Sequence, residues 1–132
     1  MQKQISLRQS IPSILAQAEP HWYAAYTRLN YEKCVAEQLD SRSLEQLLPL
    51  YGSVRQSKDR KVRLASPLYP GYVFVRIALQ ERSRVLEVPG VVNLVGHSNH
   101  PVRVSEEDIS TVRLRLNSQY RAEPHARLNT NC

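Results

Sequence analysis

The sequence is poor in the residues that build several common classes of functional site. Only two of its 132 residues are cysteine, Cys34 and Cys132, too few for a disulfide framework or a cysteine-ligated zinc site. We therefore expect both thiols to be reduced, as in a cytoplasmic protein. Four glycines are present and none belongs to a phosphate-binding loop. No apolar run approaches the length of a membrane-spanning helix.

Recognisable catalytic and metal-binding patterns are also missing. His97 and His100 are three residues apart, but no cysteine or carboxylate stands at ligand spacing from them. No serine or cysteine lies in a nucleophile-elbow sequence. The acidic run from Glu106 to Asp108 is typical of the start of a helix rather than of an acid–base pair. We expect no enzymatic activity, no metal site and no cofactor.

Acidic residues are outnumbered. The chain has 12 of them against 18 lysines and arginines, which gives a net charge of +6 and an isoelectric point near 9.6. Such a surplus favours polyanionic partners such as DNA, RNA or a ribonucleoprotein machine, although a solubilising surface charge explains it equally well. Residues 1–20 lack the continuous apolar segment of a signal peptide. We expect a mobile N-terminal arm on a monomeric, cytoplasmic protein.

What is present between residues 21 and 119 is a regular alternation of strand and helix patterns. Strand formers predict a first strand at 21–27. Asn30 is the expected N-cap of a helix that ends near Ser43, because its apolar residues follow the spacing of one buried stripe. A second strand is expected at 44–51, followed by a polar, extended hairpin excursion at 52–64.

The second half continues the alternation. A strand is expected at 72–77, a short helix at 80–88, a turn at Pro89-Gly90 and a strand at 91–95. Ser105 and the acidic residues after it predict a capped last helix. The first six elements match a ferredoxin-like α+β fold, an antiparallel four-stranded sheet with helices on one face. Residues 120–132 show no periodicity and are expected to be a tail.

The most informative segment reads Pro-Leu-Tyr-Pro-Gly-Tyr-Val-Phe-Val over residues 67–75. Successive strand residues point to opposite faces, so Tyr72 and Phe74 share one face while Val73 and Val75 share the other. The aliphatic face suits the core. The aromatic face has three explanations, namely a second core, a platform for stacking nucleic-acid bases, or a docking surface for another protein.

The base-stacking explanation has partial support. Gly71, Tyr72, Phe74 and Val75 fit the signature of RNA-recognition motifs. Pro70 replaces its phosphate-binding cation, however, and Ile77 replaces its last stacking ring. An RNA-recognition-like module that binds single-stranded RNA through Tyr72 and Phe74 stays an alternative.

A wider set of motifs resembles the N-terminal (NGN) domain of the NusG/RfaH family of transcription elongation and antitermination factors. The resemblance covers about Trp22 to Gln119. In chain order the motifs are Trp22-Tyr23-Ala24-Ala25-Tyr26-Thr27, Glu32-Lys33-x-Val35-Ala36-Glu37-Gln38-Leu39, Leu48-Pro49, the segment 67–75, and Val88-Pro89-Gly90-Val91-Val92.

The resemblance implies a non-catalytic factor that binds RNA polymerase. In this family an apolar surface docks on the clamp coiled coil of the largest subunit, and the domain spans the cleft toward the second large subunit, which suppresses pausing. The resemblance assigns the clamp-docking role to Tyr26, Tyr69, Pro70, Tyr72 and Phe74.

The remaining assignments concern nucleic acid and the far side of the cleft. The resemblance places Arg28 and Lys33 near upstream or non-template DNA, and it places Arg82, Ser83 and Arg84 at the gate-side contact with the second large subunit. The basic excursion supplies further candidates for contact with backbone phosphates, unless it is simply a solvated hairpin loop. Those candidates are Arg55, Lys58, Arg60 and Lys61.

The chain departs from the family pattern at its C-terminal end. Family members normally continue through a linker into a small β-barrel, the KOW domain, whereas residues 126–132 contain no barrel-like strands. We expect three units: an arm at 1–20, an NGN-like polymerase-binding domain at 21–119, and a linker-like tail at 120–132 without a KOW domain. The alternatives are a stand-alone domain and an inactive truncated remnant.

Overall fold

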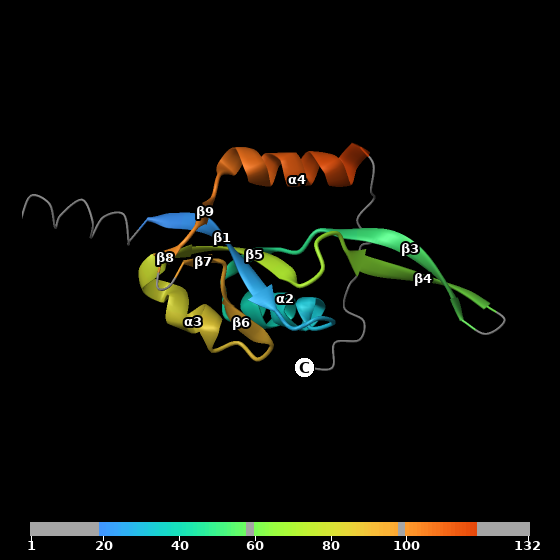
Figure 1. Cartoon of the computed structure of the whole chain (residues 1–132), viewed down its shortest axis with the longest axis horizontal. Helices are drawn as coiled ribbons and strands as arrows, with labels where there is room; N and C mark the ends of the chain where they lie inside the picture. The colour runs from blue at the N-terminus through green and yellow to red at the C-terminus, as the bar shows by residue number, and fades with distance from the viewer. Residues whose placement is uncertain (1–18, 58–59, 98–99, 119–132) are drawn as a thin grey trace, which may run out of the picture.

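The computed structural model describes residues 19–57, 60–97 and 100–118, and an antiparallel sheet forms its centre (Figure 1). The order of the strands across the sheet is β2 (Glu45–Leu47), β5 (Tyr72–Ala78), β1 (Pro20–Thr27) and β6 (Val91–Leu94). A short strand, β9 (Arg103–Val104), also pairs with β1. This order is that of a ferredoxin-like sheet, which confirms the α+β class.

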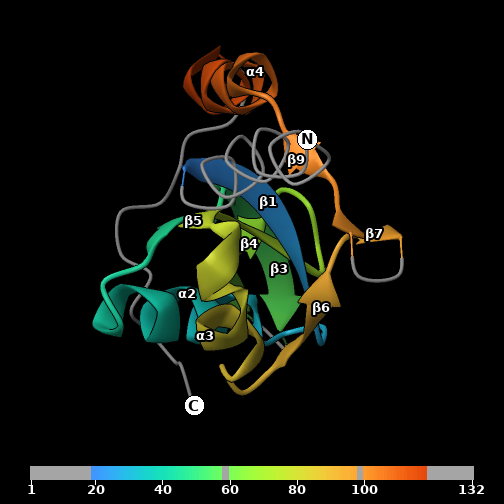
Figure 2. The same cartoon turned by 90° about the vertical axis from the view of Figure 1, so that its left-hand side faces the viewer.

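One face of the sheet is covered by α2 (Glu32–Ser41) and α3 (Arg82–Leu86) (Figure 2). Between these helices and the sheet lies the main core, because alternate residues of β1 and β5 point into it. The strands contribute Tyr23, Ala25, Val73, Val75 and Ile77, and the helices contribute Val35, Leu39 and Val85. The predicted inward direction of Val73, Val75 and Ile77 is therefore confirmed.

The last helix, α4 (Glu106–Ser118), lies across the opposite face of the sheet (Figures 1 and 2). Ser105 Oγ accepts a hydrogen bond from the Asp108 N–H at 3.0 Å, as the capping pattern predicts. Ile109 and Val112 are buried residues of α4, and Trp22 of β1 is buried as well. The expectation of helices on one face thus holds for α2 and α3 but not for α4, whose Arg113 guanidinium lies over the Trp22 ring, 5.7 Å from its centroid.

A two-stranded ribbon projects beyond the sheet (Figure 1). It consists of β3 (Leu50–Ser57) and β4 (Arg60–Pro67), paired in antiparallel register from Leu50 opposite Pro67 to Ser57 opposite Arg60. The predicted second strand at 44–51 is therefore divided between β2 and the start of the ribbon. Pro49 separates the two parts, because proline has no N–H to donate to a sheet.

Two helix predictions need correction. Asn30 has φ 72° and is not the N-cap; Tyr31 occupies that position without a side-chain capping bond. Asparagine tolerates this left-handed conformation, so Asn30 forms a turn instead. The helix expected at 80–88 consists of a 3₁₀ turn (Leu79–Glu81) followed by α3.

The loop after β6 contains two short strands that the sequence did not predict. These are β7 (Gly96–His97) and β8 (His100–Pro101), and they pair with each other. The expected turn at Pro89-Gly90 is present, with φ +99° at Gly90.

Cys34 is buried in the first turn of α2, and the expectation that both thiols are reduced stays a prediction, because the other cysteine is not among the described residues. Cys132 lies outside the described residues, as do residues 1–18 of the expected arm and the expected tail at 120–132. Among the helices that the structure describes, none is long and apolar enough to cross a membrane.

A candidate docking surface and its surroundings

Four aromatic side chains gather on the sheet face opposite α2 and α3. Tyr26 of β1 stands directly across from Tyr72 of β5, and their ring centroids are 5.6 Å apart. Tyr69, in the turn before β5, packs edge-on against Phe74 with centroids 6.0 Å apart. We call Tyr26, Tyr69, Tyr72 and Phe74 the aromatic cluster. The structure thus brings together four of the five predicted docking residues, and Pro70, the fifth, lies exposed in the adjoining turn.

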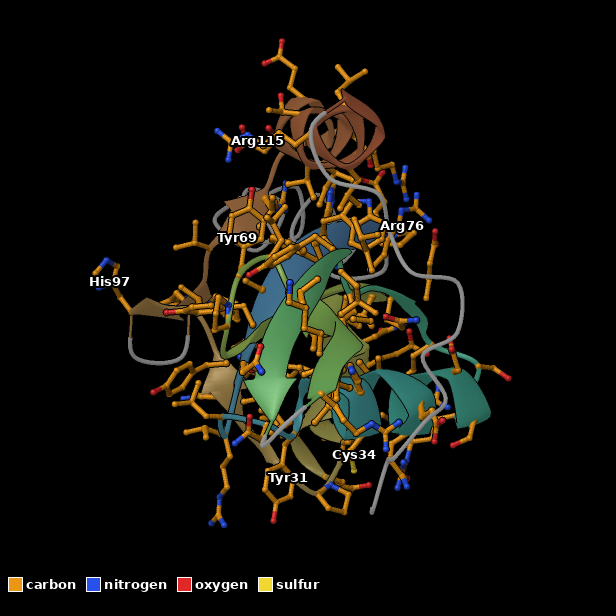
Figure 3. All side chains as sticks on the ribbon, turned by 90° about the vertical axis from the view of Figure 1, so that its right-hand side faces the viewer. Tyr31, Cys34, Tyr69, Arg76, His97 and Arg115 are labelled. Atoms are coloured by element: carbon orange, nitrogen blue, oxygen red, sulfur yellow. The ribbon has the colours of Figure 1, made fainter. Side chains whose placement is uncertain are left out.

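The cluster is open to solvent on the side of Tyr26 and Tyr72. Their side chains are 45% and 37% exposed, whereas Tyr69 and Phe74 are half-buried. The C-terminal half of α4 borders the cluster, because Arg115 Nη1 donates a hydrogen bond to the Tyr69 hydroxyl at 3.3 Å (Figure 3). Adjacent exposed apolar side chains on a folded domain typically mark a partner site. A second core is excluded for Tyr26 and Tyr72 by their exposure.

The turn that carries Tyr69 and Pro70 is held at Gly71. Gly71 has φ +89°, a conformation that favours glycine. Its carbonyl accepts a hydrogen bond from the Thr27 N–H at 2.8 Å, and its own N–H donates to Glu32 Oε2 at 2.7 Å. The turn is therefore joined to both β1 and α2.

Sequence reasoning missed three residues around the cluster. Leu29 is 66% exposed, and its Cδ2 would lie 3.8 Å from a Cβ placed on Gly71, as would Tyr26 Cε1. Leu29 therefore extends the apolar surface beyond Tyr26. The sequence could have indicated this role, because Leu29 is an apolar residue in the short polar loop after β1. The residues next to Arg115 and Glu32 in the sequence do not indicate the hydrogen bonds that these two side chains form, since their partners are distant in sequence.

The predicted nucleic-acid contacts are distributed over several elements. Arg28 is exposed at the end of β1, and Lys33 is half-buried on α2. Arg60 and Lys61 are exposed on β4, in the projecting ribbon. Arg55 lies in β3, and Lys58 lies outside the described residues. The ribbon therefore presents cations away from the sheet, separately from Arg28.

The predicted gate-side residues lie in α3, on the opposite face of the sheet from the aromatic cluster (Figure 2). Ser83 and Arg84 are exposed, and Arg82 is half-buried. Arg84 Nη1 forms an ion pair with Glu81 at 3.2 Å, and Nη2 donates to the Arg42 carbonyl at 2.7 Å. The two groups of predicted polymerase contacts thus occupy opposite sides of the domain.

His97 and His100 are exposed neighbours across the pairing of β7 with β8. Over residues 19–57, 60–97 and 100–118, no three His, Cys, Asp or Glu side chains come together in a group that could hold a metal ion.

Comparisons with known proteins agree on one family. The family model described as "Transcription termination factor nusG" matches residues 20–113. Among curated relatives, "Transcription termination/antitermination protein NusG" of Rickettsia felis is 24% identical over 134 residues, covering 91% of this chain and 70% of that protein. The protein of the same name from Helicobacter pylori is 26% identical over 115 residues, covering 78% of this chain and 65% of that protein.

A solved structure is also similar. It is titled "Domain interaction in Thermotoga maritima NusG" and matches with 25% identity and a TM-score of 0.56. The match covers 81% of this chain and 62% of the Thermotoga chain. The chain therefore spans less than two thirds of the length of that protein.

Proposed function

The chain belongs to the NusG family, and we propose that it is a transcription elongation and antitermination factor that docks on the clamp of RNA polymerase. In this proposal the aromatic cluster and Pro70 contact the clamp coiled coil of the largest subunit. The bound domain steadies the elongating enzyme and suppresses pausing or termination. The proposal assigns it no chemical step.

The observation that carries the proposal is the aromatic cluster. Tyr26 and Tyr72 are in ring contact with each other and yet substantially exposed, with Leu29 beside them. Aromatic side chains are favoured anchors in protein interfaces, where a single anchor contributes about 2 kcal/mol or more. A partner that covers these rings removes apolar surface from water.

The proposal also assigns roles to the other predicted contacts. Arg82, Ser83 and Arg84 of α3 face the second large subunit, since α3 lies on the far side of the sheet from the cluster. Arg28, Lys33 and the cations of the ribbon contact upstream or non-template DNA through its phosphates. A domain with binding surfaces on opposite sides is suited to bridging a cleft.

The alternative of RNA stacking is less well supported. A stacking platform requires open ring faces, whereas Phe74 is half-buried and has Tyr69 packed edge-on against it. The ring planes of Tyr72 and Tyr26 are tilted by 46° relative to each other, so these two rings do not form one flat surface for stacking.

A double substitution tests the proposal. Tyr72→Ala with Phe74→Ala removes two rings worth about 2 kcal/mol each at an interface, so we expect roughly 10³-fold weaker binding to core RNA polymerase. Tyr31→Ala is the matched control, because Tyr31 is 41% exposed and lies away from Tyr69 (Figure 3). Pull-down and titration against core polymerase provide the measurement, with circular dichroism to check that each variant is folded.

Unchanged binding of the folded double variant would contradict clamp docking through the cluster. Binding of single-stranded RNA at low salt, lost in the same variant, would favour the RNA alternative instead. A wild-type chain that binds neither polymerase nor RNA would indicate an inactive remnant.

A further inference from the structure

Glu32 is a buried carboxylate in a chain whose acidic residues are mostly on the surface. Its side chain is only 4% exposed, although it begins α2 beside an open loop. Burial of a charged group is costly unless the group is hydrogen-bonded. An exposed acidic residue would stabilise the start of the helix equally well. The burial of Glu32 therefore needs a different explanation.

The partner of the carboxylate is the turn that carries the docking residues. Glu32 Oε2 accepts the Gly71 N–H at 2.7 Å, a contact between residues 39 positions apart in sequence. On the other side of the same residue, the Gly71 carbonyl accepts the Thr27 N–H at 2.8 Å. Gly71 is therefore held from two sides, by α2 and by β1, and both bonds lie at the edge of the aromatic cluster.

We propose that Glu32 is a positioning residue that holds the turn at residues 69–71 in the conformation needed for docking. This inference rests on the proposed function, because it concerns the same surface. The residues on either side of the Pro70-Gly71 turn are Tyr69 and Tyr72, each of which contacts another ring of the cluster. A turn released from Glu32 changes the relative positions of these rings.

The chemistry of the contact suits a fixed anchor. A hydrogen bond from a backbone N–H to a carboxylate is shorter and stronger than one between neutral groups. The negative charge is also favourable at the N-terminal end of α2. Thr27, whose N–H holds the other side of Gly71, is itself 1% exposed, so both anchors are shielded from competing water.

Three substitutions at Glu32 separate this role from a general structural one. Glu32→Ala removes the acceptor. Glu32→Asp keeps the charge at the start of α2 but shortens the side chain by one methylene, so it loses the reach to Gly71 while preserving the helix. Glu32→Gln keeps both the length and an acceptor oxygen. Glu37→Ala is the matched control, since Glu37 is an exposed acidic residue of the same helix.

Two readouts are compared in each folded variant, namely the hydrogen-exchange rate of the Gly71 amide by NMR and the affinity for core RNA polymerase. In Glu32→Ala and Glu32→Asp we expect faster Gly71 exchange and about tenfold weaker polymerase binding or more. We expect Glu37→Ala to keep both values near those of the wild type, and Glu32→Gln, which keeps a weaker neutral acceptor, to give values between those of the wild type and Glu32→Ala.

Wild-type polymerase affinity in folded Glu32→Asp, or unchanged Gly71 exchange in that variant, would overturn the inference and leave the proposed function standing. Failure of the wild-type chain to bind polymerase would overturn the proposed function and with it the docking role of Glu32. The Glu32→Asp variant keeps the test decisive if Glu32→Ala does not fold.

Discussion

At the scale of single residues, two glycines with similar backbone conformations have different surroundings. Gly71 and Gly90 have φ +89° and +99°, which L-residues rarely adopt. A Cβ on Gly71 would meet its nearest neighbours at 3.8 Å, an ordinary contact distance. A Cβ on Gly90 would lie 2.9 Å from Tyr31 Cδ2 and 3.1 Å from Val35 Cγ2. The positive φ disfavours every residue type except glycine at both positions. Only at Gly90 would an added Cβ also overlap with neighbouring atoms.

We therefore predict that alanine is more harmful at Gly90 than at Gly71. Both substitutions incur backbone strain of about 1–2 kcal/mol. Gly90→Ala adds a steric overlap against the start of α2, which costs roughly 1–3 kcal/mol more. The free energy of unfolding from urea titrations provides the comparison, and each variant serves as the control of the other. Equal destabilisation would mean that the neighbours of Gly90 move aside without cost.

At the scale of elements, the alternation of residues in β1 and β5 predicts both faces of the sheet. Val73, Val75 and Ile77 point into the main core, and Tyr72 and Phe74 point away from it. Trp22, Ala24 and Tyr26 share a face by the same rule, but the pattern does not say what covers them. In the structure Trp22 is buried, with Arg113 of α4 over its ring, whereas Tyr26 is exposed.

We predict that the packing of α4 on the sheet can be followed through Trp22, the single tryptophan of the chain. Ile109 is fully buried on α4, so Ile109→Ala should destabilise the protein by about 2–5 kcal/mol. Because Trp22 then becomes more accessible to water, we expect its fluorescence to shift to longer wavelength. Leu114→Ala on the same helix is the control, because Leu114 is 65% exposed and surface changes typically stay within about 0.5 kcal/mol.

A tryptophan spectrum in Ile109→Ala identical to that of the wild type, in a folded protein, would contradict this account. It would mean that Trp22 stays shielded when the packing of α4 is weakened. The guanidinium of Arg113 over the Trp22 ring, 5.7 Å from its centroid, would then be the main cover.

The features that could be predicted from sequence are those encoded by neighbouring residues. Strand alternation, the Ser105 cap and the turn at Gly90 depend on local patterns, and they agree with the structure. The features that were missed depend on distant partners or on competing local preferences. Nothing near Glu32 in the sequence indicates that it binds Gly71, and nothing near Arg115 indicates Tyr69. The single strand expected at 44–51 is divided between β2 and the start of β3, because Pro49 interrupts the pairing.

At the scale of the whole molecule, the positive charge and the apolar surface are found in different places. The aromatic cluster lies on the sheet, whereas Arg60 and Lys61 lie exposed on the ribbon that projects from it (Figure 1). In the proposed function, this separation allows the cluster to contact a protein while the ribbon contacts the phosphates of a nucleic acid.

This separation leads to a prediction about salt dependence. If the ribbon contacts phosphates, each neutralised phosphate releases counterions, and the logarithm of the affinity falls linearly with the logarithm of the salt concentration. Arg60→Gln and Lys61→Gln should each reduce that slope by about 1 for a short duplex DNA. Arg103→Gln, an exposed cation on β9 away from the ribbon, should leave the slope unchanged. Fluorescence anisotropy over a series of salt concentrations measures the slope. Equal slopes for all three variants would mean that the ribbon is a solvated loop and that the net charge of the chain acts without a defined phosphate site.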